Sequence, residues 1–91
     1  MKPSADTALR IYMIAICGTG MSALAGLLKE AGHSVTGSDA NIFPPVSILL
    51  KNYGIEVKPG YRADNVMEST DLVIFGNAVS QDNPEAKAVM E

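Results

Sequence analysis

The chain has 91 residues and a formal net charge of −3, and 47% of its residues are hydrophobic and 19% are charged. That length suffices for one small domain with a modest core, and the composition excludes a disordered tail. The negative charge gives no general attraction for nucleic acid or an anionic membrane, so we expect neither as a partner. The single cysteine, the polar N-terminus and the lack of a long apolar run favour a cytoplasmic protein in a reducing compartment.

Strands and helices are expected to alternate after a polar lead-in over residues 1–10. The predicted strands are short apolar or β-branched runs, namely Ile11–Ile16, Ser34–Ser38, Ile55–Lys58 and Asp71–Phe75. The connector between the last two, residues 61–70, is polar and has room for one helical turn. We leave Tyr61, at its start, out of the candidate site.

The predicted helices carry apolar residues at i, i+3, i+4 and i+7, which gives each helix one apolar stripe. These stripes are Met21, Leu24, Ala25 and Leu28 in a helix over 21–31, and Val46, Leu49, Leu50 and Tyr53 in a helix that follows Pro45. Gly32 and Gly54 are suited to end the two helices in the left-handed conformation. A third helix is expected to begin at Pro84 with Asn83 as its N-cap. Because the sequence stops soon afterwards, we expect a fragment of a longer protein.

This alternation of elements predicts an α/β fold, a Rossmann-like parallel sheet with helices on both faces. Right-handed crossovers leave few topologies, and we expect the strand order 3-2-1-4. In that order the chain reverses direction between the first and fourth strands. A crevice then opens above the carboxyl ends of these strands, where ligands bind in such folds.

A glycine-rich turn lies between the first strand and the first helix. The pattern is Gly18-x-Gly20-x-x-Ala23, the dinucleotide-type fingerprint with alanine for the third glycine, a variant that allows close packing of helix and strand. The first amides of the helix, on Gly20 and Met21, are suited to bind a phosphate. The hydroxyls of Thr19 and Ser22 either add hydrogen bonds to that phosphate or cap the helix.

Asp39 follows the second strand, about 20 residues beyond the turn, where a carboxylate can accept hydrogen bonds from a ribose. Asn77 and Ser80 lie in the loop after the fourth strand, at the same end of the sheet. Cys17 has no base beside it in the sequence and is expected to be a small buried residue. No Walker-type ATP motif, carboxylate pair or metal-ligand cluster occurs, so we expect no catalytic residue, metal or cofactor in this domain.

Three stretches in register resemble the N-terminal domain of the Mur ligases of bacterial peptidoglycan synthesis. They are Ile16–Ala25, then Gly32–Asn41 with Pro44-Pro45, then Gly76–Ser80 with Asp82–Glu85. The Cys-Gly-Thr turn and the Gly-Asn-Ala segment are more similar to the members that attach a tripeptide, L-alanyl-γ-D-glutamyl-meso-diaminopimelate, during murein recycling than to the members that add L-alanine. Ala15 departs from the glycine that the family usually has, and we place it in the strand before the phosphate turn.

The resemblance implies that residues 11–91 are the UDP-binding domain of a three-domain, ATP-dependent ligase. The substrate of such an enzyme is UDP-N-acetylmuramate, whose carboxylate is activated as an acyl phosphate and attacked by the amine of a peptide. ATP and Mg²⁺ are implied for the whole enzyme, and the peptide is bound by other domains. By position, Gly18 to Ser22 would face the pyrophosphate, Ser38 and Asp39 the uridine, and Asn77, Ala78 and Ser80 the uridine or the muramyl group.

Two alternatives remain open on the residues alone. The glycine turn and Asp39 equally permit the NAD(P)-binding domain of an oxidoreductase, which has no evident reason to match the loop with Asn83-Pro84-Glu85. A regulatory nucleotide sensor would be expected to have a complete last helix. The favoured interpretation is a ligase domain that is inactive by itself.

Overall fold

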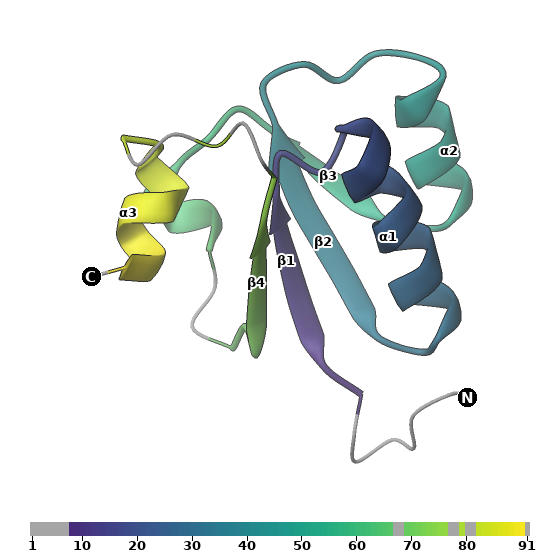
Figure 1. The fold of residues 1–91 in the computed structure, drawn as a ribbon, viewed down its shortest axis with the longest axis horizontal. Helices are drawn as coiled ribbons and strands as arrows, with labels where there is room; N and C mark the ends of the chain where they lie inside the picture. Colours follow the sequence, from purple (N-terminus) through teal and green to yellow (C-terminus); the bar gives the residue numbers. More distant parts are fainter. Residues whose placement is uncertain (1–7, 67–68, 77–78, 80–81, 91) are drawn as a thin grey trace.

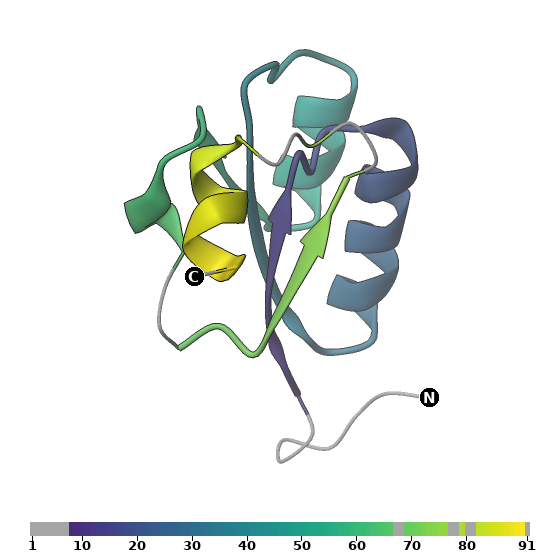
Figure 2. The same cartoon turned by 60° about the vertical axis from the view of Figure 1, so that its left-hand side comes forward.

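The computed structural model describes residues 8–66, 69–76, 79 and 82–90. Four parallel strands form one sheet in the order β3-β2-β1-β4, with bounds β1 Arg10–Ile14, β2 Ser34–Asp39, β3 Glu56–Pro59 and β4 Leu72–Phe75. On one face lie α1 (Thr19–Glu30) and α2 (Val46–Asn52), and on the other lie α3 (Pro84–Met90) and the 3-10 turn η1 (Ala63–Asn65) (Figures 1 and 2). The predicted fold class, strand order and placement of helices on both faces are confirmed.

The strand β1 ends two residues earlier than predicted, because Ala15 leaves the extended conformation. Its φ angle is 68°, in the left-handed region that costs a residue with a side chain about 1–2 kcal/mol. The amides of Ala15 and Ile16 both donate to the carbonyl of Ser38, at 2.9 and 3.0 Å. The chain therefore stays bound to β2 while it turns, and α1 begins at Thr19 rather than at the expected Met21.

A hydrophobic core lies between the sheet and the pair α1 and α2. Its buried members come from all of these layers: Ile11, Met13, Ile16, Ala25, Val35, Leu50 and Ile55. Met21, Leu28, Val46 and Tyr53 of the predicted helix stripes pack against it. Two stripe positions differ from the prediction, because Leu24 and Leu49 are 37% and 43% exposed. Burial of this apolar surface is the main term that stabilises the fold.

Two close approaches bring the layers together. A Cβ atom on Gly37 would lie 2.5 Å from the carbonyl oxygen of Met13, and one on Gly26 would lie 2.8 Å from the ring of Tyr53. Because glycine has no Cβ, Gly37 lets β2 lie close to β1, and Gly26 lets α1 lie close to Tyr53 at the end of α2. The fingerprint alanine does not serve close packing as expected: Ala23 is exposed, whereas Ser22, Ala25 and Gly26 are the small residues that α1 buries.

Both long helices end as predicted. The amides of Gly32 and His33 donate to the carbonyls of Lys29 and Leu28, which is the Schellman arrangement, and Gly32 has a φ of 99°. Gly54, with a φ of 76°, ends α2 in the same way. None of the described helices is long and apolar enough to cross a membrane.

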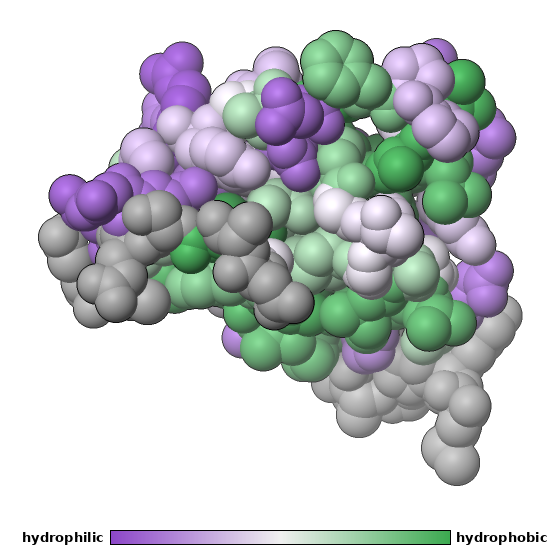
Figure 3. Space-filling view, turned by 45° about the horizontal axis from the view of Figure 1, so that its top comes forward, coloured by the Kyte–Doolittle hydropathy of each residue, from purple (hydrophilic) through white to green (hydrophobic). Residues whose placement is uncertain are grey.

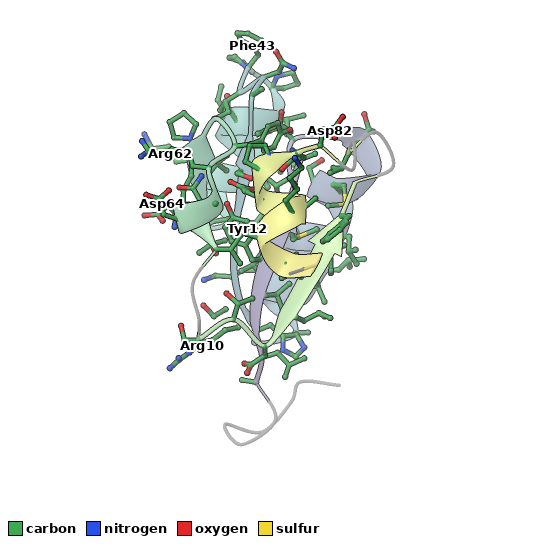
Figure 4. All side chains as sticks on the ribbon, turned by 90° about the vertical axis from the view of Figure 1, so that its left-hand side faces the viewer. Arg10, Tyr12, Phe43, Arg62, Asp64 and Asp82 are labelled. Carbon is green, nitrogen blue, oxygen red and sulfur yellow. The ribbon has the colours of Figure 1, made fainter. Side chains whose placement is uncertain are left out.

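The face of the sheet that carries α3 is held by a buried polar cluster. The carboxylate of Glu85, at the start of α3, accepts hydrogen bonds from the hydroxyls of Tyr12 and Ser38, from the side-chain amide of Asn65 and from the backbone amide of Arg62. We call these five residues the Glu85 cluster. In Figure 4, Tyr12 lies beside α3, while Arg62 and Asp64 point away into solvent. The expected N-cap is confirmed, since the side chain of Asn83 accepts the amides of Glu85 and Ala86.

Candidate functional site

The glycine turn presents backbone amides at the carboxyl ends of the strands. Gly18 is the N-cap of α1, and because glycine has no side chain, the cap leaves the first amides of the helix free of a side-chain acceptor. The first helical bond runs from the amide of Ser22 to the carbonyl of Gly18, at 2.8 Å. Gly18, Thr19 and Gly20 are all exposed. The positive end of the helix dipole therefore faces solvent at this turn.

The two hydroxyls of the turn lie differently. Thr19 is exposed, whereas Ser22 is only 4% exposed and its hydroxyl donates to the carbonyl of Thr19 at 3.0 Å. Neither hydroxyl caps the helix, because Gly18 occupies the N-cap position. Of the two, Thr19 is thus the residue whose side chain is open to a ligand at the turn.

A pocket of about 510 Å³ lies between the turn and the end of β4, and we call it the β4 pocket. It is lined by Ala15, Gly18, Thr19, Gly20, Met21, Leu24, Ile74, Phe75 and Gly76. Its position is the crevice expected between the first and fourth strands. None of these residues is charged, so an anion in this pocket would depend on backbone amides for its hydrogen bonds.

A second pocket, of about 310 Å³, lies on the other side of the turn, and we call it the Asp39 pocket. It is lined by Ala15, Cys17, Gly18, Asp39, Asn41 and Tyr61. The two pockets share Ala15 and Gly18, so they form adjoining spaces on either side of the glycine turn. With the top of the molecule turned forward, the middle of the surface is mostly neutral or hydrophobic, and strongly hydrophilic residues lie at the upper left, in the upper middle and along the right edge (Figure 3).

The carboxylate of Asp39 joins the walls of its pocket. One oxygen accepts the amide of Cys17 at 3.0 Å, and the other accepts the amide of Asn41 at 2.9 Å. Asp39 is only 7% exposed, and its carbonyl accepts the amide of Gly60 at 3.0 Å. Asp39 therefore orders the glycine turn and its own loop, and each carboxylate oxygen retains a further lone pair.

Two ionisable side chains beside Asp39 are kept neutral. Burial, together with the negative charge of Asp39, raises the pKa of the Cys17 thiol and of the Tyr61 hydroxyl. A raised pKa makes Cys17 a poor nucleophile, as expected, and it packs against the core, but it is half-buried rather than buried and lines the pocket. The described residues contain no group of three or more His, Cys, Asp or Glu side chains that could hold a metal ion.

The predicted site residues fall into three groups. The turn residues and Asp39 line the two pockets or border them. Ser38 is fully buried, and its hydroxyl donates to Glu85, so it lies beneath the pocket rather than in its wall. Asn77, Ala78 and Ser80 lie outside the described residues, and their expected contacts stay a prediction.

Tyr61 is a lining residue of the Asp39 pocket that the sequence interpretation explicitly left out. It stands just after β3, at the same edge of the sheet as Asp39, and both contribute to one pocket. The signal was available, because the carboxyl ends of parallel strands meet at one edge. The connector after Pro59 and Gly60 has no regular pattern, so the position of Tyr61 beside Asp39 was not predicted.

The chain matches a known family and several curated relatives. The family, described as "Mur ligase family, catalytic domain", matches residues 10–91. The UDP-N-acetylmuramate–L-alanyl-γ-D-glutamyl-meso-2,6-diaminoheptandioate ligase of Escherichia coli (strain K12) is 51% identical over 91% of this chain and 18% of its own length. The UDP-N-acetylmuramate–L-alanine ligase of Lactobacillus acidophilus is 39% identical over 94% of this chain and 20% of its own length.

A solved structure shows the same similarity in three dimensions. The murein peptide ligase of Psychrobacter arcticus superposes with a TM-score of 0.86 at 38% identity, over 91% of this chain and 17% of that one. The chain thus spans about a fifth of the length of the relatives it matches. The match over residues 10–91 covers most of the sequence. The chain belongs to the Mur ligase family.

Proposed function

We propose that this domain binds the UDP part of UDP-N-acetylmuramate across the glycine turn. The pyrophosphate would lie at the amides of Thr19, Gly20 and Met21, and the uridine in the Asp39 pocket. The muramyl group would extend toward the β4 pocket and the loop that follows β4. The observation that carries this proposal is the uncapped N-terminus of α1 between two adjoining pockets.

The chemistry of the two pockets supports an elongated ligand whose anionic part is held at one place, the glycine turn. The β4 pocket offers no lysine or arginine, so the anionic part of the ligand would be held by amides and the helix dipole. The Asp39 pocket combines an aromatic ring with polar atoms, a combination suited to a nucleoside. Both curated relatives named above carry UDP-N-acetylmuramate in their names, which favours this ligand over a nicotinamide dinucleotide.

For the whole protein we propose ATP-dependent formation of an amide between the muramyl carboxylate and a peptide. The higher identity to the tripeptide-attaching relative, 51% against 39%, favours L-alanyl-γ-D-glutamyl-meso-diaminopimelate as the second substrate over L-alanine. ATP, Mg²⁺ and the peptide would be bound by parts of the protein beyond this domain. The domain by itself would then bind without catalysing.

Calorimetric titration tests the binding proposal directly. UDP-N-acetylmuramate, NADH and NADPH are titrated into the 91-residue chain at the same concentrations. We expect heat of binding from the UDP-sugar alone. If a nicotinamide nucleotide binds and the UDP-sugar does not, the oxidoreductase alternative replaces the proposal. If none of the three ligands gives heat of binding, the domain alone does not bind them.

Asp39→Ala is expected to weaken binding of UDP-N-acetylmuramate by about 1–3 kcal/mol, because a charged acceptor is lost from the pocket. Asp39→Asn keeps the shape of the side chain and one acceptor, so its effect should be smaller. Asp64→Ala is the matched control, since that carboxylate is 72% exposed and paired with Arg62 at 3.3 Å. Equal affinities for Asp39→Ala and the control would remove Asp39 from the site.

A further inference from the structure

Glu85 is a fully buried carboxylate that four donors surround. Oε2 accepts the Tyr12 hydroxyl at 3.0 Å, the Asn65 amide at 2.7 Å and the backbone amide of Arg62 at 3.1 Å, while Oε1 accepts the Ser38 hydroxyl. Its exposed fraction is 0%. A carboxylate has two oxygens with about four lone-pair sites, so this one side chain can accept all four donors at once. Burial of a carboxylate is costly, which makes this arrangement more than a chance contact.

The cluster holds the segment that carries Tyr61. Asn65 donates both to Glu85 and to the carbonyl of Gly60, the latter at 3.3 Å. The residue on the other side of Tyr61, Arg62, donates its amide to Glu85. Tyr61 is therefore flanked on both sides by groups fixed to one carboxylate, while its ring lines the Asp39 pocket.

The cluster also holds the strand end that carries Asp39. Ser38 donates its hydroxyl to Glu85, and the next residue, Asp39, reaches across to accept the amide of Cys17 in the glycine turn. The Asp39 carbonyl accepts the amide of Gly60, which closes a link back to the Tyr61 segment. Both walls of the Asp39 pocket thus depend on contacts with Glu85.

We propose that Glu85 is a positioning residue for nucleotide binding, which fixes Tyr61 and Asp39 from beneath the pocket without touching the ligand; this inference rests on the proposed function. Glu85 comes from α3, beyond the loop that follows β4, and its carboxylate joins that helix to both walls of the pocket. Lys58 lies close by, with its Nζ 5.8 Å from the centre of the Tyr12 ring and 3.1 Å from the carbonyl oxygen of Asn65. Lys58 therefore contacts two members of the Glu85 cluster, Tyr12 and Asn65.

The test measures affinity for UDP-N-acetylmuramate by calorimetry, at a temperature where circular dichroism shows each variant to be folded. Asn65→Ala removes the link between Glu85 and Gly60 but leaves the carboxylate three donors. We expect its dissociation constant to rise about fivefold, the size of one lost hydrogen bond. Glu85→Ala should raise it more than tenfold, and Glu85→Gln, which keeps the shape and one acceptor oxygen, should restore most of the affinity.

Two controls separate positioning from general stability. Lys87→Ala changes an exposed side chain on the same helix and should leave the dissociation constant unchanged. In a Tyr61→Ala background, Asn65→Ala should lose its effect, because it acts through Tyr61. The backbone amide of Arg62 donates to Glu85, so its protection from hydrogen exchange should be lost in Glu85→Ala and retained in Glu85→Gln. This result would support positioning of Tyr61 through Glu85.

Each outcome decides the proposal. If the wild-type chain binds and the folded Asn65→Ala and Glu85→Ala variants both match its dissociation constant within twofold, Glu85 is not a positioning residue. The proposal would also be overturned if Asn65→Ala raises the dissociation constant by the same factor with and without Tyr61→Ala. If Glu85→Ala does not fold, the Asn65→Ala and Tyr61→Ala pair gives the answer. A wild-type chain that fails to bind would reject the proposed function first, and this inference with it.

Discussion

Tyr12 and Met13 are neighbours on β1, yet they point to opposite faces of the sheet and are held by different chemistry. Met13 is 0% exposed and packs among hydrocarbon side chains beneath α1 and α2. Tyr12 is 2% exposed, and its hydroxyl donates to the carboxylate of Glu85 beneath α3. One face is therefore stabilised by burial of apolar area, whereas the other combines buried apolar residues, Ile14 and Ala86, with directed hydrogen bonds to Glu85.

The two faces determine different features of the structure. Apolar packing is non-directional and tolerates exchange of side chains when the volume is kept, so it decides which layers meet. A buried polar cluster is stable only when every member has its partner, so it fixes particular atoms at particular distances. Accordingly, the polar face is the one that holds the Asp39 pocket in shape.

Met13→Ala should give the largest loss of stability, about 2–5 kcal/mol, because it leaves a cavity in the apolar core. Urea unfolding followed by circular dichroism measures the change. Leu27→Ala is the control, since Leu27 also belongs to the α1 and α2 side but is 65% exposed, and it should stay within about 0.5 kcal/mol of the wild type. A loss below 1 kcal/mol for Met13→Ala would mean that the apolar face is not the main source of stability.

Tyr12→Phe should cost less, about 1.5–3 kcal/mol, because it deletes one hydrogen bond to a carboxylate and keeps the ring. The same urea titration detects it. Tyr53→Phe removes a hydroxyl from a half-buried side chain that packs against the apolar core, and we expect a change below about 0.5 kcal/mol. Equal losses for the two tyrosines would erase the distinction between the faces.

The apolar face was predictable because its signals are local. The spacing of Val46, Leu50 and Tyr53 places one stripe on a helix, and glycines at the helix ends mark where α1 and α2 stop. Strand order followed from alternation and crossover handedness. Turn chemistry likewise predicted where the first amides of α1 lack a side-chain cap, since a strand that stops at glycine before a helix leaves those amides exposed.

The polar face was not predictable, because its contacts join residues far apart in the chain. Tyr12 and Glu85 are separated by 73 positions, and no periodicity pairs them. Sequence reasoning assigned Ser38 to the ligand, whereas the structure directs its hydroxyl to Glu85. Tyr61 was left out of the site, because an irregular connector carries no pattern that shows which way a ring faces.

Alkaline pH should weaken the polar face selectively. Burial, and to a smaller extent the negative charge of Glu85, raises the pKa of Tyr12 above its ordinary value near 10, and burial likewise raises the pKa of Tyr61. The stability that these neutral phenols contribute is fully present below pH 10 and is lost as the pH rises toward the folded-state values. Above pH 10 the free energy of unfolding should fall by at most about 1.4 kcal/mol per pH unit for each tyrosine.

Urea titrations between pH 8 and pH 11 measure this loss. Tyr12→Phe should flatten the alkaline decline more than Tyr61→Phe, because Tyr12 is the more deeply buried of the two. Met13→Ala should lower stability equally at all these pH values, since it changes no ionisable group. A decline that Tyr12→Phe leaves unchanged would show that the alkaline sensitivity does not come from the Glu85 cluster.

Ala15→Gly should give the smallest effect and the only gain. Ala15 lies where β1 leaves the sheet, and its φ of 68° costs about 1–2 kcal/mol that glycine does not incur. Glycine loses about 0.5–1 kcal/mol through the entropy of the unfolded chain, so the net gain should be about 0.5–1 kcal/mol. Ala25→Gly, in the interior of α1, should instead lower stability, because its backbone is helical. If both variants lose stability alike, Ala15 does not adopt the left-handed conformation, and the geometry of the turn between the two pockets would have to be revised.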